Sequence, residues 1–357
     1  MMNEHAPYIL TDSKSLEEAL SQRLTDKGRI FILADYNTAE HCLPMIQSML
    51  PQDGKDCMLM DLAAGEDAKS LDTAMDLYRQ LITYGADRSS VMINLGGGMV
   101  CDLGGFVAST YKRGMEFIHV PTTVLAQVDA AIGGKTGVNL GSLKNMVGNF
   151  TLPSATLIYP EFLNTLPKRE VMAGFAEILK HALIADHLLW TKILEAPYID
   201  LPLIKSIIPE ASHVKVGIVN RDFEEKGERK KLNFGHTIGH ALESLILESP
   251  GKNLLHGEAV ALGMIAESYL SMKAGKLSDD ELKAISDFIA QHYKPIELDR
   301  MQFHRIIELM SHDKKNKRSK VNFTLLNGIG DSLIDQEPDM EDVMEALNYL
   351  ERYPFPA

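Results

Sequence analysis

The strongest constraint on the fold is a change of pattern partway along the chain. Over residues 1–160, short β-rich runs alternate with amphipathic helical runs. The candidate strands are 29–35, 57–62, 91–95, 117–120 and 156–159. Among the helical runs, 70–84 carries one largely apolar face, predicted to consist of Leu71, Met75, Tyr78, Leu81 and Ile82. Alternation of this kind predicts a mostly parallel, Rossmann-like sheet that binds ligands at the carboxyl ends of its strands.

After Pro153, Pro160 and Pro167 the pattern becomes helical, and the run 321–326 is the one further strand we expect. The helical runs are 169–184, 201–219 with a break at Pro209, 232–247, 256–274, 279–292 and 341–352. We therefore predict an α/β domain over residues 1–165 and an α-helical domain over residues 166–357. We expect the active site in the cleft between them.

Charge and cysteine content exclude several classes of protein. The 357 residues contain 36 Lys plus Arg and 49 Asp plus Glu, a net charge of −13, which argues against nucleic acid or an anionic membrane as a partner. Three cysteines are too few for a disulfide framework. No apolar run approaches the roughly 20 residues of a membrane helix, and the first residues lack a signal-peptide pattern. We expect a cytoplasmic protein.

A glycine-rich turn follows the third candidate strand. Gly96, Gly97 and Gly98 lead into a helical run that contains Asp102. Glycines let a phosphate approach the backbone, and free N–H groups at the start of a helix attract anions. The sequence is not the G-x-G-x-x-G fingerprint. From the residues alone it is either a pyrophosphate site or a tight turn.

A second glycine-rich segment, 129–150, contains Lys135 and Lys144. Glycine amides beside ammonium groups suit an oxyanion, whereas the alternative is a solvated surface loop. The segment is not a P-loop, because Asp129 stands where that motif requires glycine.

Three helical segments supply possible metal ligands. His236 and His240 share one helix face, and His256 begins another helix. Glu177 and Lys180 lie three residues apart on a third. Two histidines and a glutamate are a known zinc set that leaves a coordination position open. The spacing leaves open whether His236 acts with His240, or one of them with His256.

Taken together, these blocks resemble the 3-dehydroquinate synthase family between about Gly65 and Leu326. The resemblance is carried by 97–102, 111–114, 121–123, 129–135, 144–145, 165–167, 174–180, 233–240 and 255–258. It implies conversion of 3-deoxy-D-arabino-heptulosonate 7-phosphate to 3-dehydroquinate and phosphate, in the shikimate pathway. The implied steps are transient oxidation by NAD, phosphate elimination, reduction, ring opening and intramolecular aldol closure.

The resemblance also implies residue roles. Glu177, His236 and His256 match the zinc ligands, with cobalt or another divalent metal possible, and His240 is left for substrate and proton transfer. The matched NAD positions are Asp35, Asn37, Glu66, Lys69, Gly97, Gly98, Asp102, Thr122, Thr123, Lys144, Thr165 and Leu166. The matched substrate positions are Asp129, Lys135, Asn145, Lys180, Lys215, Arg229, Asn233, His240 and Lys314. Arg113 is expected to reach across a homodimer interface.

A metal-dependent alcohol or glycerol dehydrogenase is the nearest alternative, because such enzymes share the glycine turn and the helical histidines. Another sugar-phosphate cyclase is a second alternative, and a NAD-binding regulatory protein without activity is a third. The net charge does not exclude an anionic sugar phosphate, because cations gathered in one cleft decide the local field. We expect the excess carboxylates to lie on the outer surface.

Overall fold

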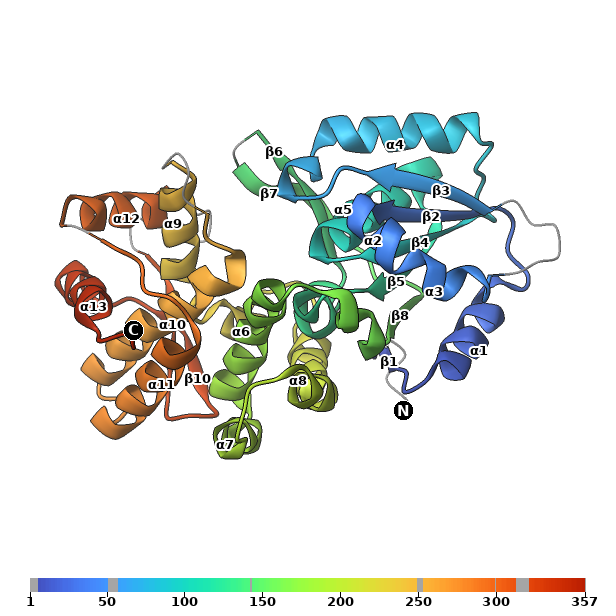
Figure 1. The fold of residues 1–357 in the computed structure, drawn as a ribbon. Coiled ribbons are helices and arrows are strands. Elements are labelled where there is room, and N and C mark those ends of the chain that lie inside the picture. The colour runs from blue at the N-terminus through green and yellow to red at the C-terminus, as the bar shows by residue number, and fades with distance from the viewer. Residues whose placement is uncertain are drawn as a thin grey trace. The chain divides into compact units, whose positions relative to one another are not determined.

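The computed structural model describes residues 6–50, 57–141, 143–248, 253–298, 300–312 and 321–356. The chain divides into two compact units, Met1–Pro167 and Lys168–Ala357. Figure 1 shows strands gathered in the first unit and helices dominating the second.

The first unit is built on one parallel sheet of six strands, in the order β1-β8-β5-β4-β2-β3. The strands are β1 (Tyr8–Ile9), β2 (Ile30–Asp35), β3 (Cys57–Leu62), β4 (Val91–Gly96), β5 (Glu116–Pro121) and β8 (Ala155–Ile158). β2 and β4 are buried on both faces, as expected for parallel strands covered by helices. The predicted parallel sheet is confirmed.

Helices cover both faces of this sheet. The elements are α1 (Ser13–Leu24), α2 (Tyr36–His41), α3 (Leu43–Gln47), η1 (Glu66–Ala68), α4 (Leu71–Thr83), α5 (Gly98–Thr110), η2 (Tyr111–Arg113), η3 (Ala126–Ala130) and η4 (Pro160–Thr165). One apolar cluster joins α1 and α3 to the sheet, and a second joins α4 and α5 to its other face. The carboxyl ends of the strands are therefore the edge left for ligands.

The helix predicted over 70–84 forms as α4, but its predicted apolar face is wrong in part. Ala74, Leu77 and Leu81 are buried, whereas Met75 and Ile82 are 49% and 66% exposed. The buried positions recur at steps of three and four, and each exposed residue lies one position further along, about 100° around the helix.

The glycine-rich segment 129–150 is not the loop we expected. From Lys135 it forms an antiparallel hairpin of β6 (Lys135–Leu140) and β7 (Leu143–Phe150), in which Gly137 pairs with Gly148. A Cβ at Gly148 would lie 2.2 Å from the backbone oxygen of Thr136. Close backbone packing thus explains these glycines, which obscure the alternating pattern of a strand.

The second unit is mainly helical. Its elements are α6 (Lys168–Ala185), α7 (His187–Glu195), α8 (Leu201–Arg221), η5 (Glu228–Asn233), α9 (His236–Leu247), α10 (His256–Lys273), α11 (Asp279–His292), α12 (Arg300–His312), β9 (Phe323–Leu326), β10 (Ser332–Gln336) and α13 (Met340–Arg352). Helix α10 lies at its core: it packs against α6, α9, α11 and α13, and most of its side chains are buried.

Three expectations for this unit are wrong. Helix α8 continues through Pro209, because buried Ile208 and Ala211 hold both sides of the proline in the core. Helix α9 begins at His236 rather than at residue 232, since Gly235 adopts a left-handed φ of 78°. Strand β10 was not expected, and it pairs antiparallel with β9. Among the described helices, none combines the length and apolar character needed to cross a membrane.

Candidate metal and nucleotide sites

The candidate metal site is placed by close packing of α6, α9 and α10. A Cβ at Gly257 would lie 1.7 Å from the backbone oxygen of Ala173 in α6. A Cβ at Gly263 would lie 2.1 Å from the backbone oxygen of Gly235, the residue before α9. Glycine at these two positions lets the three backbones approach. His256, next to Gly257, is consequently fixed at the start of α10 beside α6.

Two of the predicted ligands converge on a carboxylate oxygen of the third. His236 Nε2 lies 3.4 Å from Glu177 Oε1, and His256 Nε2 lies 3.5 Å from the same atom. The nitrogens of His236, His240 and His256 lie within 4.8 Å of one another. The structure therefore brings all four candidate residues together. Proximity alone does not decide which of them bind the metal.

The electrostatics of this cluster favour a cation between the ligands. Glu177 is fully buried, its Oε2 pairs with Lys180 Nζ, and its Oε1 faces the two histidines. Burial would raise the pKa of Glu177, but the charges of Lys180 and His236 outweigh burial and hold the pKa well below its usual value. An ionised, buried carboxylate facing two imidazole nitrogens fits a divalent metal.

The two histidines respond differently to their surroundings. Burial lowers the pKa of His236, which Glu177 offsets in part. Burial acts in the same direction on His256, but hydrogen bonds to Glu177 and Glu243 raise its pKa to about 9. The protonated form of His256 is thus stabilised more strongly than that of His236. Glu243 is one cause of this difference, and sequence reasoning missed it.

Three predicted cations of the second unit are buried. Lys180, Lys215 and Arg229 are at most 6% exposed. Lys180 Nζ pairs with Glu177 Oε2, and Arg229 Nη1 donates to the Phe223 carbonyl oxygen at 2.5 Å. The predicted substrate residue Asn233 donates to Glu225 Oε1 at 3.1 Å. Lys and Arg side chains are rarely buried this completely in folded proteins unless they are paired. Buried cationic side chains also suit recognition of an anion.

In the first unit the glycine turn joins β4 to α5. Gly97 is the N-cap of α5, and no side chain caps this helix start within the described residues. A Cβ at Gly97 would lie 3.1 Å from Thr123 Cγ2, so glycine leaves the backbone accessible beside the residues after β5. The Thr122 amide donates to the Gly96 oxygen at 3.0 Å. An uncapped helix start in this position can hold a phosphate.

A hydrogen-bond network lies beside this turn. Lys69 Nζ, which is buried, lies 2.6 Å from Asp102 Oδ2 and 2.5 Å from Asn145 Oδ1. Burial lowers the pKa of Lys69, but Asp102 and Glu66 outweigh it and the pKa is raised. Asn139, which sequence reasoning missed, donates to Glu66 Oε1 and accepts from the Asn145 amide at 2.8 Å. Its one available signal was its place in the glycine-rich segment.

The remaining predicted residues lie at several places in the first unit or outside the described residues. Those on the carboxyl side of the sheet, after or beside strand ends, are Asp35, Asn37, Glu66, Thr122, Thr123, Thr165 and Leu166. Lys135 and Lys144 are exposed on the β6–β7 hairpin, and Asp129 lies in η3. Arg113 is exposed in η2, at the opposite end of α5 from the glycine turn. Lys314 lies outside the described residues.

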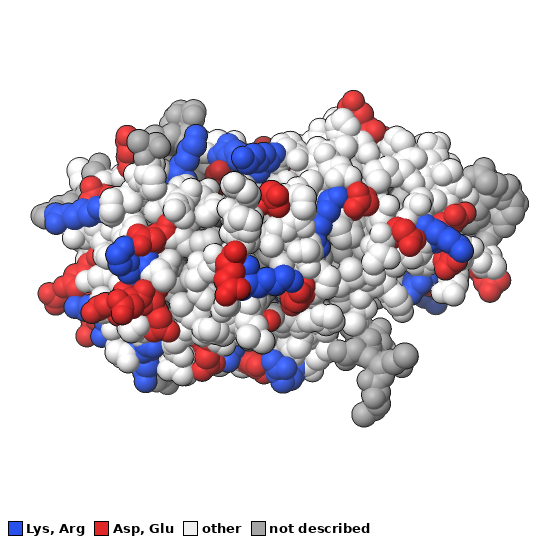
Figure 2. All heavy atoms as spheres, turned by 60° about the horizontal axis from the view of Figure 1, so that its bottom comes forward, with Lys and Arg blue, Asp and Glu red and all other residues white. Residues whose placement is uncertain are grey.

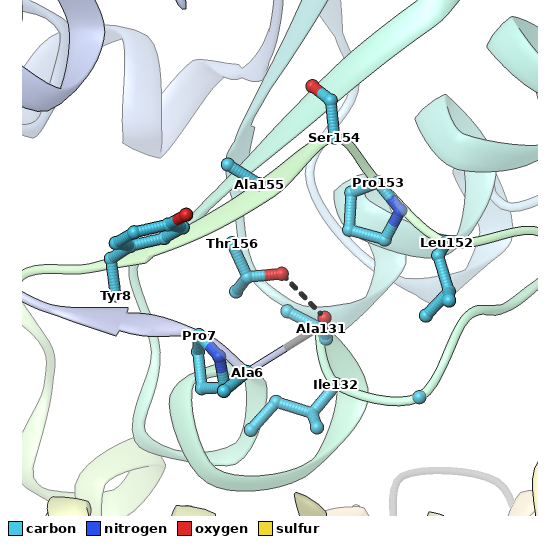
Figure 3. Close-up of a pocket in the computed structure, with 11 residues that line it drawn as sticks. Ala6, Pro7, Tyr8, Ala131, Ile132, Leu152, Pro153, Ser154, Ala155 and Thr156 are labelled. Atoms are coloured by element: carbon cyan, nitrogen blue, oxygen red, sulfur yellow. Dashed lines mark hydrogen bonds between the residues drawn. The ribbon is translucent and has the colours of Figure 1, made fainter. Parts of the chain in front are cut away.

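A small pocket of the first unit takes no part in these sites. Figure 3 shows Tyr8, Ile132 and Pro153 around it, with the Thr156 hydroxyl donating to the Ala131 oxygen at 3.2 Å. None of the residues that line it is a predicted site residue. On the face drawn in Figure 2, basic and acidic side chains are interspersed.

Family models of 3-dehydroquinate synthase match the chain over two consecutive stretches: its N-terminal part over residues 59–173 and its C-terminal part over residues 174–316. A 3-dehydroquinate synthase of Parabacteroides distasonis is 39% identical over 351 residues, covering 98% of both chains. One of Campylobacter concisus is 38% identical and covers 91% of this chain and 93% of its own. The chain belongs to the 3-dehydroquinate synthase family.

Solved structures agree on the fold. The 2-epi-5-epi-valiolone synthase ValA of Streptomyces hygroscopicus, solved with NAD⁺ and Zn²⁺ bound, superposes with a TM-score of 0.82 at 25% identity and covers 97% of this chain and 96% of its own. A glycerol dehydrogenase structure from Sinorhizobium meliloti, described as probable, reaches 0.66 at 14% identity, covering 97% and 96%. The dehydrogenases share the fold, whereas the family match lies with the synthases.

Proposed function

We propose that this chain is a 3-dehydroquinate synthase, a carbon–oxygen lyase of the shikimate pathway. It converts 3-deoxy-D-arabino-heptulosonate 7-phosphate to 3-dehydroquinate and phosphate, with NAD and a divalent metal as cofactors. Within the family, the observation that carries the proposal is the buried Glu177 carboxylate, whose Oε1 faces His236 and His256 at 3.4 and 3.5 Å. A buried carboxylate that faces two imidazole nitrogens fits a divalent cation held between them.

Glu177, His236 and His256 would hold the metal, with zinc the expected ion and cobalt an alternative. The glycine turn at Gly97 and Gly98 would hold the NAD pyrophosphate. When bound, the metal lowers the pKa of the substrate hydroxyl and NAD takes up and returns a hydride. The other NAD contacts named in the sequence analysis remain predictions. The Lys69–Asp102 pair lies next to the glycine turn.

His240 serves as the proton relay of this proposal. It lies one turn after His236 on α9, and its ring centroid is 5.2 Å from that of His236 and 5.6 Å from that of His256. Imidazole can hold or release a proton near neutral pH. His240→Ala should therefore keep the metal and lose turnover. Loss of the metal from that variant would make His240 a ligand instead.

The buried cations Lys180, Lys215 and Arg229 would bind the carboxylate and phosphate of the substrate, since Arg offers bidentate contact to an oxyanion. Lys135, Asn145, Asp129, Asn233 and Lys314 complete the proposed substrate set. In this assignment, residues 1–165 bind NAD and contribute Asp129, Lys135 and Asn145 to the substrate site, and residues 166–357 bind the metal and the rest of the substrate.

The homodimer and the cytoplasmic location also remain proposals. Arg113 lies at the far end of α5 from the glycine turn, which is compatible with a role toward a second copy. Mixing an Arg113→Ala variant with a variant inactive at His240 tests this role. If Arg113 acts across the interface, the mixed dimers regain part of the activity that both parents lack.

The main test is a phosphate-release assay with the heptulosonate phosphate as substrate. Phosphate should appear with NAD and zinc or cobalt present, and its release should stop when either cofactor is removed. NADH should not accumulate, because the hydride is returned. Net NADH formation from glycerol without phosphate release would reject the proposal in favour of a dehydrogenase.

A further inference from the structure

We propose that Glu243 is a positioning residue that orients His256 toward the metal. This inference rests on the metal site of the proposed function. Glu243 lies on α9, three residues after His240, and its Oε2 is 3.4 Å from His256 Nδ1. The other ring nitrogen, Nε2, is the one that faces Glu177. Glu243 thus contacts the ring nitrogen that does not face Glu177.

The backbone of His256 is fixed before Glu243 acts. Gly257 packs its backbone against Ala173 of α6, and Arg169 pairs with the Glu258 carboxylate through Nε and Nη2, both at 2.7 Å. Glu258 also accepts from the Leu255 amide at 2.9 Å. These contacts place the Cα of His256 but leave its side-chain torsions to be decided. Among the described residues, the Glu243 carboxylate is the group that contacts Nδ1 of His256.

His236 shows what this contact supplies. Its Nδ1 lies 3.1 Å from the Phe234 carbonyl oxygen, which accepts when that nitrogen carries the proton. An acceptor at Nδ1 selects the tautomer whose Nε2 lone pair is free for a metal. Both ligand histidines therefore have Nδ1 acceptors and Nε2 atoms turned to Glu177 Oε1. In His236 the acceptor is backbone, and in His256 it is an ionisable side chain that can be exchanged.

The burial of Glu243 supports a role beyond surface charge. The residue is 8% exposed, while Leu247, the last residue of the same helix, and Glu248, its C-cap, are exposed. A buried carboxylate is costly unless it is paired. Partners of this kind typically contribute 10- to 100-fold to metal affinity, because a ligand held in its binding orientation loses less freedom when the metal arrives.

The experiment measures affinity for Zn²⁺ alone, by competition with a chromophoric chelator, in wild type, Glu243→Ala and Glu243→Gln. We expect Glu243→Ala to weaken Zn²⁺ binding by about 10- to 100-fold. Glu243→Gln keeps an acceptor oxygen and should recover part of that loss. The matched control is Glu248→Gln, an exposed carboxylate at the C-cap of the same helix that pairs with Arg305, and it should bind Zn²⁺ like wild type.

Two further measurements separate the possible failures. The absorption spectrum of the Co²⁺-loaded protein should shift in Glu243→Ala, because a reoriented imidazole changes the ligand field. Unchanged Zn²⁺ affinity with a lowered melting temperature would overturn the inference and leave Glu243 a structural residue. His256→Ala tests the metal site itself: if that variant also keeps full affinity, the ligand assignment of the proposed function fails, whereas loss there with none in Glu243→Ala rejects the positioning role alone.

Discussion

Two helices of this protein begin with a glycine N-cap, and their starts are completed in opposite ways. Helix α5 follows Gly97, and no described side chain caps it. Helix α9 follows Gly235, and its start is filled by Glu267 of α10, which accepts from the Gly235 amide at 2.7 Å and from the Ile238 amide at 3.0 Å. The first turn of any helix has N–H groups without a partner inside the helix, and these attract an anion. At α5 this position is open, whereas at α9 it is taken by the Glu267 carboxylate.

The difference shows how each unit builds its site. In the first unit the backbone itself is the proposed binding group, so the helix start must stay open to a phosphate. In the second unit the binding groups are side chains at helix starts, His236 in α9 and His256 in α10. Their positions need rigid backbones, and a buried carboxylate at the start of α9 supplies one.

The largest expected effect is on the metal. His236→Ala removes a ligand but leaves the helix start and Glu267 in place. We expect Zn²⁺ affinity to fall by about 1,000-fold or more, roughly 4 kcal/mol, with NAD affinity unchanged. Chelator competition and NAD titration measure the two affinities separately. The control is His213→Ala, an exposed histidine of α8. Equal losses of NAD and metal would contradict the division of cofactors between the units.

The reciprocal variant closes the open helix start. Gly97→Asp places a preferred N-cap residue before α5 and a negative charge where the pyrophosphate should bind. NAD affinity should fall by about 100-fold, roughly 3 kcal/mol, while Zn²⁺ affinity stays at the wild-type value. Thermal stability should be maintained, because the new carboxylate caps the helix. Isothermal titration with NAD and a melting curve measure both quantities.

Gly97→Ala is the control for side-chain size, since its Cβ would lie 3.1 Å from Thr123 Cγ2. If alanine and aspartate weaken NAD binding equally, the loss comes from crowding, and the helix start is not an anion site.

The open start could be predicted from the sequence, whereas the filled one could not. A strand, three glycines and a helix stand together at 91–102, so local pattern was enough. Glu267 and Glu243 act across the contact between α9 and α10, which depends on how closely Gly263 approaches Gly235. Nothing in the spacing of residues 243 and 267 reports that contact. The chemistry of histidine singled out the candidate ligands, whereas the particular set Glu177, His236 and His256 came from the family resemblance.

The β6–β7 hairpin makes the same point for the fold. The sequence left an oxyanion site and a solvated loop open for this segment, and the structure adds that Gly137 and Gly148 lie opposite each other where two backbones approach. A glycine in a sequence can indicate that another group lies close to the backbone, but it does not indicate which group. At Gly97 the proposed neighbour is a phosphate, and in the hairpin it is another strand.

A smaller effect is expected at the filled helix start. Glu267→Gln replaces one acceptor oxygen with an N–H group that faces a backbone donor. This should lower the free energy of unfolding by about 1–3 kcal/mol, because a buried amide loses its partner. Zn²⁺ affinity should fall by about tenfold, since His236 is the first residue of α9. Urea unfolding and chelator competition test both, with Glu248→Gln as the exposed control. Normal stability and affinity together would show that the cap is dispensable.

The smallest expected effect concerns the charge state of buried titratable groups, which differs between the two units. In the second unit, the buried Glu177 carboxylate keeps a lowered pKa because Lys180 lies beside it. In the first, burial lowers the pKa of His119 to about 3, and its Nδ1 lies 3.2 Å from the uncharged Asn94 amide nitrogen. His119 is therefore neutral in the folded protein at pH values where it binds a proton in the unfolded chain, whose pKa is near 6.5.

Because the unfolded state binds the extra proton, the stabilising contribution of neutral His119 is complete above about pH 6.5 and is lost progressively as the pH falls toward 3. His119→Gln keeps a polar partner for Asn94 and removes this titration. Well below pH 6.5, the free energy of unfolding of wild type should fall with acidification more steeply than that of the variant, by up to about 1.4 kcal/mol per pH unit. Urea unfolding at pH 7, 6 and 5 measures the slopes, with exposed His41→Gln as control. Parallel slopes for wild type and His119→Gln would mean that His119 accepts a proton in the folded sheet. In that case burial of His119 in β5 would not exclude charge from the first unit, and the contrast with the Glu177–Lys180 pair would fail.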